Sequence, residues 1–375
     1  MTMTTKPIGL YVHIPFCVRK CNYCDFCSFP VDSIPEKAEY LAALCREIES
    51  YRDREIHIDS IFFGGGTPSL LTPEEMEGVV LSIKKSFVLS SDIEFTVEAN
   101  PKTLDEKKLL ALVRLGVNRL SIGLQSIHEN EQKILGRIHN YDDFAEMYTL
   151  ARRCGIENVN VDLMYGIPEQ TMDSFAKTLS SVAELSPEHI SLYGLILEEG
   201  TPFYERQDGL SLPSEDAECD MYYYAGEFLH KKGYSHYEIS NYAKAGRECR
   251  HNLKYWRDEE YIGVGPSAYS YFEGKRFGNT RDLREYIDGN CAKYDSEEII
   301  DKVDEAYEFV MLGLRLAEGF SLDEYKRKFG IDFEAGREEI LEKFAKEGYL
   351  TKEDGRLSLT ERGFYVSNTI INELI

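Results

Sequence analysis

Short apolar runs alternate with amphipathic segments over the first two hundred residues, and this alternation limits the possible folds more than any other feature. The apolar runs fall at 8–14, 58–66, 93–100, 117–126, 159–168 and 189–197. Helical periodicity is evident between them, as at 35–50, 72–87 and 104–116. Strands that alternate with helices form parallel sheets, so the class is α/β. Six units are fewer than the eight of a complete barrel. We therefore predict a partial (β/α)6 TIM-like barrel, with a doubly wound sheet as the alternative.

Polar residues and glycines follow several of these predicted strands, where ligands bind in either fold. A cysteine-rich loop follows the first strand and Gly64-Gly65-Gly66-Thr67-Pro68 follows the second. Glu98 and Asn100 end the third strand, and Gln125 ends the fourth. Helix signals flank them: Thr72 before Pro73 is typical of an N-cap, and Gly116 of a helix stop.

The regular alternation of predicted strands and helices ends at about residue 200, which indicates that the rest of the chain is organised differently. A helix at 214–232 and a strand at 234–240 precede an aromatic, glycine-rich stretch at 249–272. From about 295 the pattern predicts helices at 303–317, 321–329 and 334–347, a hairpin at 349–360 turning at Asp354-Gly355, and a final helix. We predict a core domain at 1–285, with an extension from about 200, and a small, mainly helical, winged-helix-like domain at 295–375. Its many acidic residues favour packing against the core over DNA binding.

Charge and hydropathy limit the partners and the compartment. Among 375 residues, 66 Asp and Glu outweigh 43 Lys and Arg, giving a net charge of −23. This charge repels phosphate backbones, so we expect no nucleic-acid partner. No apolar run is long enough to span a bilayer, and the N-terminus lacks the pattern of a signal peptide. We expect a cytoplasmic protein with at most peripheral membrane contact.

Four of the nine cysteines lie within eleven positions, at Cys17, Cys21, Cys24 and Cys27. Disulfides are rare in the cytoplasm, so such clustering suggests metal or redox chemistry. A structural zinc site usually takes two Cys pairs separated by a longer loop, which this spacing fits poorly. Cys17-x3-Cys21-x2-Cys24, with Tyr23 before the third cysteine, instead resembles the radical SAM superfamily.

That resemblance implies a [4Fe–4S] cluster held by Cys17, Cys21 and Cys24. Iron–sulfur clusters normally take four protein ligands, so three leave one iron open. In this superfamily S-adenosylmethionine chelates that iron through its amino and carboxylate groups. Cys27 falls outside this set, and its role stays open between a spare thiol, a protecting ligand and a buried residue.

Further segments narrow the resemblance to the coproporphyrinogen III oxidase-like (HemN/HemW) family. They are YVHIPFC, GGGTP, LSIGLQS, GRIH and DLMYGIPEQT, and the resemblance covers residues 8 to about 272. It places S-adenosylmethionine against Tyr11, Tyr23, Gly65, Gly66, Thr67, Glu98, Gln125, Arg137 and Asp162. Glu98 and Asp162 suit ribose hydroxyls and a sulfonium, and Arg137 suits a carboxylate.

The segment His251-Asn252-Leu253-Lys254-Tyr255-Trp256 resembles a signature of the haem chaperone branch of this family. A neutral imidazole is a common haem ligand, and aromatic rings can pack on a porphyrin. We therefore expect haem contacts from His251, Asn252, Tyr255 and Trp256. Other candidates for the axial ligand are His13, His139, His236 and Cys249.

The favoured hypothesis is a haem chaperone that binds haem as cargo and transfers it to acceptor haemoproteins, among them respiratory ones. The alternative is an oxygen-independent coproporphyrinogen III oxidase or a related radical enzyme. The short segment before Cys17 and the Cys24-x2-Cys27 spacing both depart from the oxidase pattern. A cluster-sensing winged-helix regulator is a third, weaker hypothesis. No catalytic residue is assigned, and the acceptor, the cleavage of S-adenosylmethionine and a homodimeric state stay open.

Overall fold

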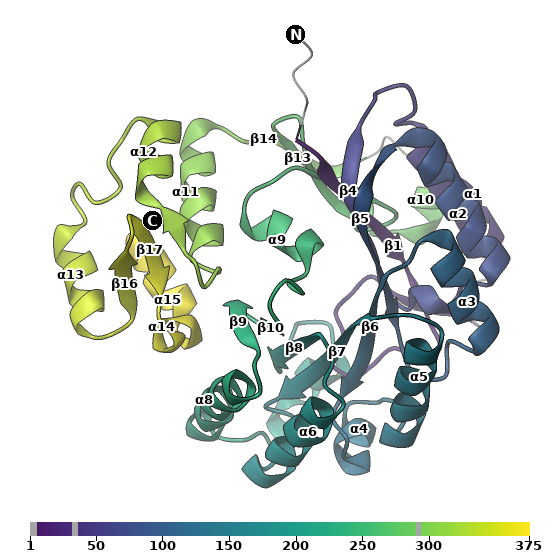
Figure 1. The fold of residues 1–375 in the computed structure, drawn as a ribbon, viewed down its shortest axis with the longest axis horizontal. Helices are drawn as coiled ribbons and strands as arrows, with labels where there is room; N and C mark the ends of the chain where they lie inside the picture. Colours follow the sequence, from purple (N-terminus) through teal and green to yellow (C-terminus); the bar gives the residue numbers. More distant parts are fainter. Residues whose placement is uncertain (1–5, 32–36, 290–293) are drawn as a thin grey trace.

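The computed structural model describes residues 6–31, 37–289 and 294–375, and its dominant element is a curved twelve-stranded sheet. Figure 1 shows this sheet with helices along its outer side and a smaller lobe beside it. Six parallel strands form its centre in chain order: β1 (Ile8–Ile14), β4 (His57–Gly65), β5 (Val88–Ala99), β6 (Arg119–Gln125), β7 (Asn158–Tyr165) and β8 (His189–Gly194). The order contains no reversal of the kind that defines a doubly wound sheet. The predicted partial barrel is thus confirmed.

Crossover helices connect these strands and cover the outside of the sheet (Figure 1). They are α1 (Lys37–Glu49), α2 (Pro73–Ser86), α3 (Glu106–Leu115), α4 (Glu129–Ile134), α5 (Tyr141–Arg153) and α6 (Met172–Glu184). Residues 35 and 36 of the first predicted helix lie outside the described residues. Thr72 and Glu75 form a capping box on α2, and Gly116 ends α3 with a φ of 107°. Both helix signals are confirmed.

Residues beyond 200 extend the sheet at both edges. Antiparallel strands β10 (Asn241–Ala243) and β9 (Ser235–Glu238) continue from β8. At the other edge β11 (Tyr261–Val264) pairs with β1 as a seventh parallel strand. It is followed by β12 (Tyr269–Phe272), β13 (Lys275–Asn279) and β14 (Tyr294–Ile299). Helices α7 (Pro202–Glu205), α8 (Glu215–Lys231), α9 (Arg250–Trp256) and α10 (Leu283–Asp288) lie between them in sequence.

The C-terminal lobe has its own apolar core, which includes Val310, Phe320, Phe333 and Phe344. Three helices precede a hairpin, as the sequence predicts: α11 (Lys302–Gly313), α12 (Leu322–Phe329), α13 (Glu338–Lys346), β16 (Leu350–Glu353) and β17 (Arg356–Leu359). The short β15 (Phe320–Ser321) adds a third strand. Helices α14 (Glu361–Tyr365) and α15 (Ser367–Leu374) end the chain. The two turn residues of the hairpin have positive φ, as a tight hairpin requires.

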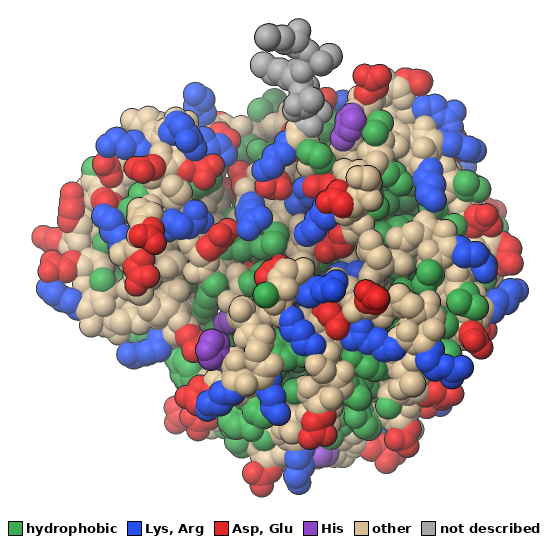
Figure 2. All heavy atoms as spheres, in the orientation of Figure 1, with side chains coloured by type: hydrophobic (Ala, Val, Ile, Leu, Met, Phe, Trp, Pro, Cys, Tyr) green, Lys and Arg blue, Asp and Glu red, His purple; other side chains and the backbone are tan. Residues whose placement is uncertain are grey.

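Charges of both signs are spread over the surface. Figure 2 shows Lys and Arg side chains interspersed with Asp and Glu on the face it presents. Within the described ranges, no helix combines the length and apolar character that crossing a bilayer requires.

Candidate active site in the partial barrel

A cavity of about 420 Å³ opens at the carboxyl ends of the parallel strands and continues into the barrel. The cysteine loop lines its mouth, together with residues after β8 such as Ile196. Its inner wall is unusually polar. It consists of inward-facing side chains from neighbouring strands, among them Glu98, Arg119, Ser121, Asn160, Asp162 and Ser191. A packed barrel interior would normally be filled by branched apolar residues, so this interior is built to hold a polar ligand.

Cys17, Cys21 and Cys24 all line this cavity, whereas Cys27 does not. Burial raises the pKa of the Cys24 thiol to about 11, and it also raises that of Cys17. These thiols therefore carry protons until a metal displaces them. Within the described residues, no group of three or more His, Cys, Asp or Glu is already arranged around a single ion. A multi-iron cluster instead binds each thiolate through a different iron.

Cys27 is held apart from the other three thiols. Its side chain is 9% exposed, and Sγ donates to the carbonyl oxygen of Arg281 at 3.4 Å. Its own carbonyl accepts from Nε2 of His13 at 2.8 Å. Of the three roles left open for Cys27, this position fits a buried residue that anchors the end of the cysteine loop.

The glycine loop after β4 lies against the cysteine loop. Gly65 has a φ of 109°, and a Cβ built on Gly66 would lie 2.6 Å from the carbonyl oxygen of Phe16. Neither position accepts a larger residue without movement of the backbone. Thr67 is buried, and its hydroxyl connects the two loops: Oγ1 donates to Sγ of Cys17 at 3.7 Å and accepts from Nδ2 of Asn100 at 2.9 Å. The glycine loop and the Thr67 hydroxyl thus lie directly against the cysteine loop.

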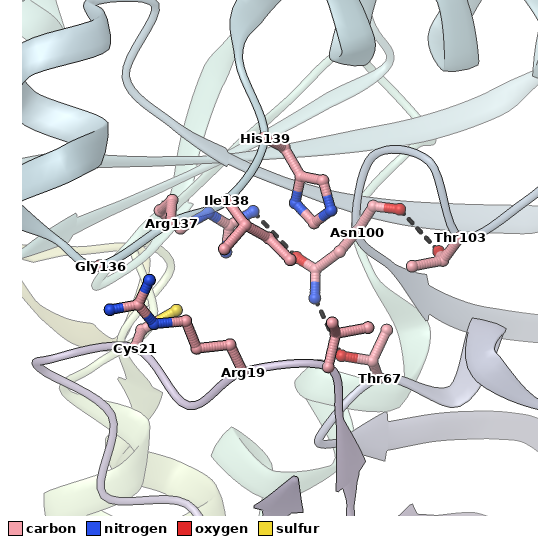
Figure 3. A pocket seen from close by; sticks show the side chains of 10 residues that line it. Arg19, Cys21, Thr67, Asn100, Thr103, Gly136, Arg137, Ile138 and His139 are labelled. Carbon is pink, nitrogen blue, oxygen red and sulfur yellow. Dashed lines mark hydrogen bonds between the residues drawn. The ribbon is translucent and has the colours of Figure 1, made fainter. Parts of the chain in front are cut away.

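Arg137 reaches into the cavity from the loop after α4. Its Nη2 donates to Oδ1 of Asn100 at 2.9 Å (Figure 3). The same nitrogen also donates to the carbonyl oxygen of Gly123. Its buried Nε has no hydrogen-bond partner among the described residues. An unpaired, buried guanidinium nitrogen costs free energy, so this atom indicates an anionic ligand such as a carboxylate. Gln125 lies nearby and has a φ of 71°, a strained conformation often found at binding sites.

Two carboxylates face the cavity from β5 and β7, the strands on either side of β6. Glu98 accepts from the backbone nitrogen of Gly65 at 3.2 Å. Asp162 accepts from Nδ2 of Asn160 at 2.7 Å. Burial and the neighbouring Asp162 raise the pKa of Glu98 to about 8, and burial also raises that of Asp162. A cationic or hydroxyl-rich ligand would stabilise the ionised carboxylates that this site otherwise disfavours.

Two tyrosines complete the predicted cofactor positions. Tyr11 packs its ring on Phe62 with centroids 6.3 Å apart, and its hydroxyl hydrogen-bonds Nδ1 of His13 at 3.0 Å. Tyr23 lines the cavity between Cys21 and Cys24. The structure thus places seven of the nine predicted S-adenosylmethionine residues in the lining of this cavity. Of the other two, Thr67 contacts the lining residues Cys17 and Asn100, and Tyr11 lies behind Phe62 and Gly64.

The predicted haem residues lie at the opposite end of the barrel, on α9. Glu94 accepts from the backbone nitrogens of Arg250 and His251, each at 3.0 Å, so a buried carboxylate anchors the start of this helix beneath the sheet. Asn252 reaches the cavity floor. Trp256 instead faces the C-terminal lobe, with the Arg315 guanidinium 5.8 Å from its ring.

His251 is buried between α9 and strand β4 of the sheet. Its side chain is 1% exposed, and its nitrogens bond the Ser60 hydroxyl at 2.9 Å and the Tyr255 hydroxyl at 2.8 Å. Burial lowers the pKa of His251 to about 3, so the ring is neutral. Iron ligation by His251 therefore stays a prediction that requires one of these bonds to break.

Arg119 is a cavity residue that was not predicted from the sequence, and it is 2% exposed. Its Nη1 donates to Oγ1 of Thr96 at 3.4 Å. The available signal was a cation at the first position of a strand in which Leu120, Ile122 and Leu124 alternate with smaller or polar residues. Asn160 and Ser121 were also missed, and Nδ2 of Asn160 donates to the Ser121 hydroxyl at 2.8 Å.

Comparisons with known proteins agree with this architecture. The radical SAM superfamily model matches residues 11–182, and the HemN C-terminal domain model matches residues 300–366. A solved structure of coproporphyrinogen III oxidase (HemN) from Escherichia coli, described as a radical SAM enzyme, superposes with a TM-score of 0.86 at 24% identity. The match covers 98% of this chain and 90% of that one, and it shows a shared fold.

Curated relatives extend over nearly the whole chain. Heme chaperone HemW of Lactococcus lactis is 35% identical over 376 residues, covering 100% of this chain and 98% of that protein. Heme chaperone HemW of Bacillus subtilis is also 35% identical and covers 97% and 98%, respectively. The chain therefore belongs to the HemW family within the radical SAM superfamily.

Proposed function

We propose that this protein is a haem chaperone, which binds haem and transfers it to acceptor haemoproteins on a radical SAM scaffold. The observation that carries this proposal is its similarity, from end to end, to relatives named heme chaperone HemW. We place it in the cytoplasm, where it would meet acceptors including respiratory haemoproteins. The proposal also divides the chain into a core domain at 1–285 and a C-terminal domain at 295–375.

The cavity fits the cofactors of the superfamily, and we assign them to named residues. Cys17, Cys21 and Cys24 would hold a [4Fe–4S] cluster, because these thiols share one cavity. Arg137 would bind the carboxylate of S-adenosylmethionine through its unpaired Nε. Glu98 and Asp162 would face its ribose and sulfonium. When bound and reduced, such a cluster supplies an electron to the sulfonium, and the protein supplies orientation and charge.

S-adenosylmethionine should bind more tightly as the pH rises to about 8. The sulfonium favours an ionised Glu98, and below a pKa of about 8 this carboxyl group is mostly protonated. The apparent affinity should therefore fall by up to about tenfold per pH unit on acidification from 8 to 6. Calorimetry on cluster-loaded protein measures this. S-adenosylhomocysteine, whose sulfur is neutral, and Glu98→Gln should both give a flatter profile. An affinity for S-adenosylmethionine that does not change over this range would contradict the role of Glu98.

Haem titration of the cluster-loaded protein tests the chaperone proposal directly. We expect a saturable shift of the Soret band, and we expect haem to pass to an apo-haemoprotein in a mixing experiment. A parallel incubation of the reduced protein with S-adenosylmethionine and coproporphyrinogen III should give no protoporphyrinogen. Failure to bind haem would contradict the chaperone proposal, and formation of protoporphyrinogen would favour the oxidase alternative.

A further inference from the structure

The eight histidines differ in whether a ring nitrogen is available to an iron. In five of them a nitrogen is already hydrogen-bonded within the protein: His13, His128, His189, His236 and His251. The alternative thiol ligand, Cys249, is fully buried and donates to Glu94 at 3.6 Å. The remaining rings are those of His57, His139 and His230, which have no hydrogen bond to any described residue. Only His139 lies beside the cofactor cavity.

His139 sits in a crevice that adjoins this cavity and shares Arg19, Cys21, Asn100 and Arg137 with it. In Figure 3 its imidazole projects among these side chains and makes none of the drawn hydrogen bonds. Burial, followed by the charge of Arg137, lowers the pKa of His139 to about 4. Asp143 and Lys102 also face this ring. The ring is therefore neutral and its nitrogen lone pair is available at pH 7.

The rim of the crevice offers apolar contacts and a cation beside the His139 imidazole. Val18 is 52% exposed and Ile138 is 47% exposed, so two apolar side chains flank the imidazole at the surface. Arg19 is exposed and makes no ion pair with any described residue. A cation at this position would attract the propionates of haem, which the net charge of −23 would otherwise repel.

We propose that His139 is the axial ligand of the haem iron, with Val18 and Ile138 against the porphyrin face and Arg19 paired with a propionate. This inference rests on the proposed haem-binding function. Binding forms one coordinate bond from an imidazole nitrogen to iron and displaces a weak ligand such as water, without electron transfer. A neutral imidazole is a common axial ligand of haem, and guanidinium–carboxylate pairs are strong. Because the crevice and the cofactor cavity share four lining residues, haem at this rim would lie next to the site assigned to S-adenosylmethionine.

The test is a haem titration of cluster-loaded, full-length wild type and single variants, read by Soret absorbance and by resonance Raman spectroscopy of the axial ligand. His139→Ala should weaken haem binding at least tenfold and remove the histidine-ligated spectrum. His139→Met should restore binding with a different spectrum. Arg19→Ala should weaken binding without changing the spectrum. His57→Ala and His230→Ala are matched controls, since they remove exposed, unbonded imidazoles that line neither the crevice nor the cavity.

The outcomes separate this inference from the proposed function. If wild type binds haem and His139→Ala gives the same spectrum and affinity, the ligand assignment is overturned while the chaperone proposal stands. Loss of the spectrum in His251→Gln, but not in His139→Ala, would move the ligand to α9. If wild type itself binds no haem, both proposals fall. Cluster content and circular dichroism of each variant show that an altered spectrum does not reflect misfolding.

Discussion

Cys17→Ala, Cys21→Ala and Cys24→Ala should each abolish the iron–sulfur cluster, whereas Cys27→Ala should retain it. The three cavity-lining thiols are the proposed ligands, and loss of one from a set of three leaves two irons without protein ligands. Cys27 instead donates to the Arg281 carbonyl in a separate, buried position. Iron and sulfide content after anaerobic reconstitution, with visible absorbance and electron paramagnetic resonance of the reduced protein, measures the effect.

The four variants control for one another because they lie in a single loop and make the same chemical change. Each Cys→Ala substitution removes one sulfur, so a general loss of loop structure would lower cluster content in all four. The expected result is near-complete loss in three and near-wild-type content in the fourth. Equal loss in all four variants would remove the distinction between Cys27 and the other three thiols, and it would contradict the assignment of three ligands with one open iron.

Much of the barrel could be predicted because its strands and helices are long and periodic. The predicted strand at 8–14 matches β1 at both ends, and the helix signals at Thr72 and Gly116 hold in the structure. The segment at 249–272 could not be assigned, because α9 has seven residues and β11 has four. Elements this short show no clear period, and pairing of β11 with the distant β1 decides their structure.

The candidate site was predictable where residues adjoin in sequence and much less so where the barrel assembles them. The cysteine spacing and the glycine loop are local patterns. By contrast, the contact of Asn100 with both Thr67 and Arg137 joins three separate loops. The placement of His251 depends on Ser60, which lies 191 residues away along the chain. Hydrogen-bond partners at such separations follow from the register of the sheet, and periodicity alone does not fix that register.

Arg119→Leu should destabilise the protein by about 3–5 kcal/mol near pH 8, because it removes a buried cation and leaves its anionic neighbours unpaired. Burial disfavours the charge on Arg119, but Cys249, Glu94, Tyr237 and Asp162 outweigh burial and raise its pKa overall. Urea denaturation of purified wild type and variant measures the difference. Thr96→Val is a matched control, since it removes only the hydrogen bond at Nη1 and should cost about 1 kcal/mol.

The pH dependence of this loss distinguishes charge from packing. At pH 5 the carboxyl group of Glu98, whose pKa is raised to about 8, is protonated, so one fewer buried anion needs the guanidinium. The stability lost in Arg119→Leu should therefore be smaller at pH 5 than at pH 8. Arg119→Lys keeps the charge and should recover part of the stability at pH 8, although it lacks the planar group that reaches Thr96. If Arg119→Leu lost the same stability at both pH values and Arg119→Lys recovered none of it, Arg119 would act through packing and not through its charge.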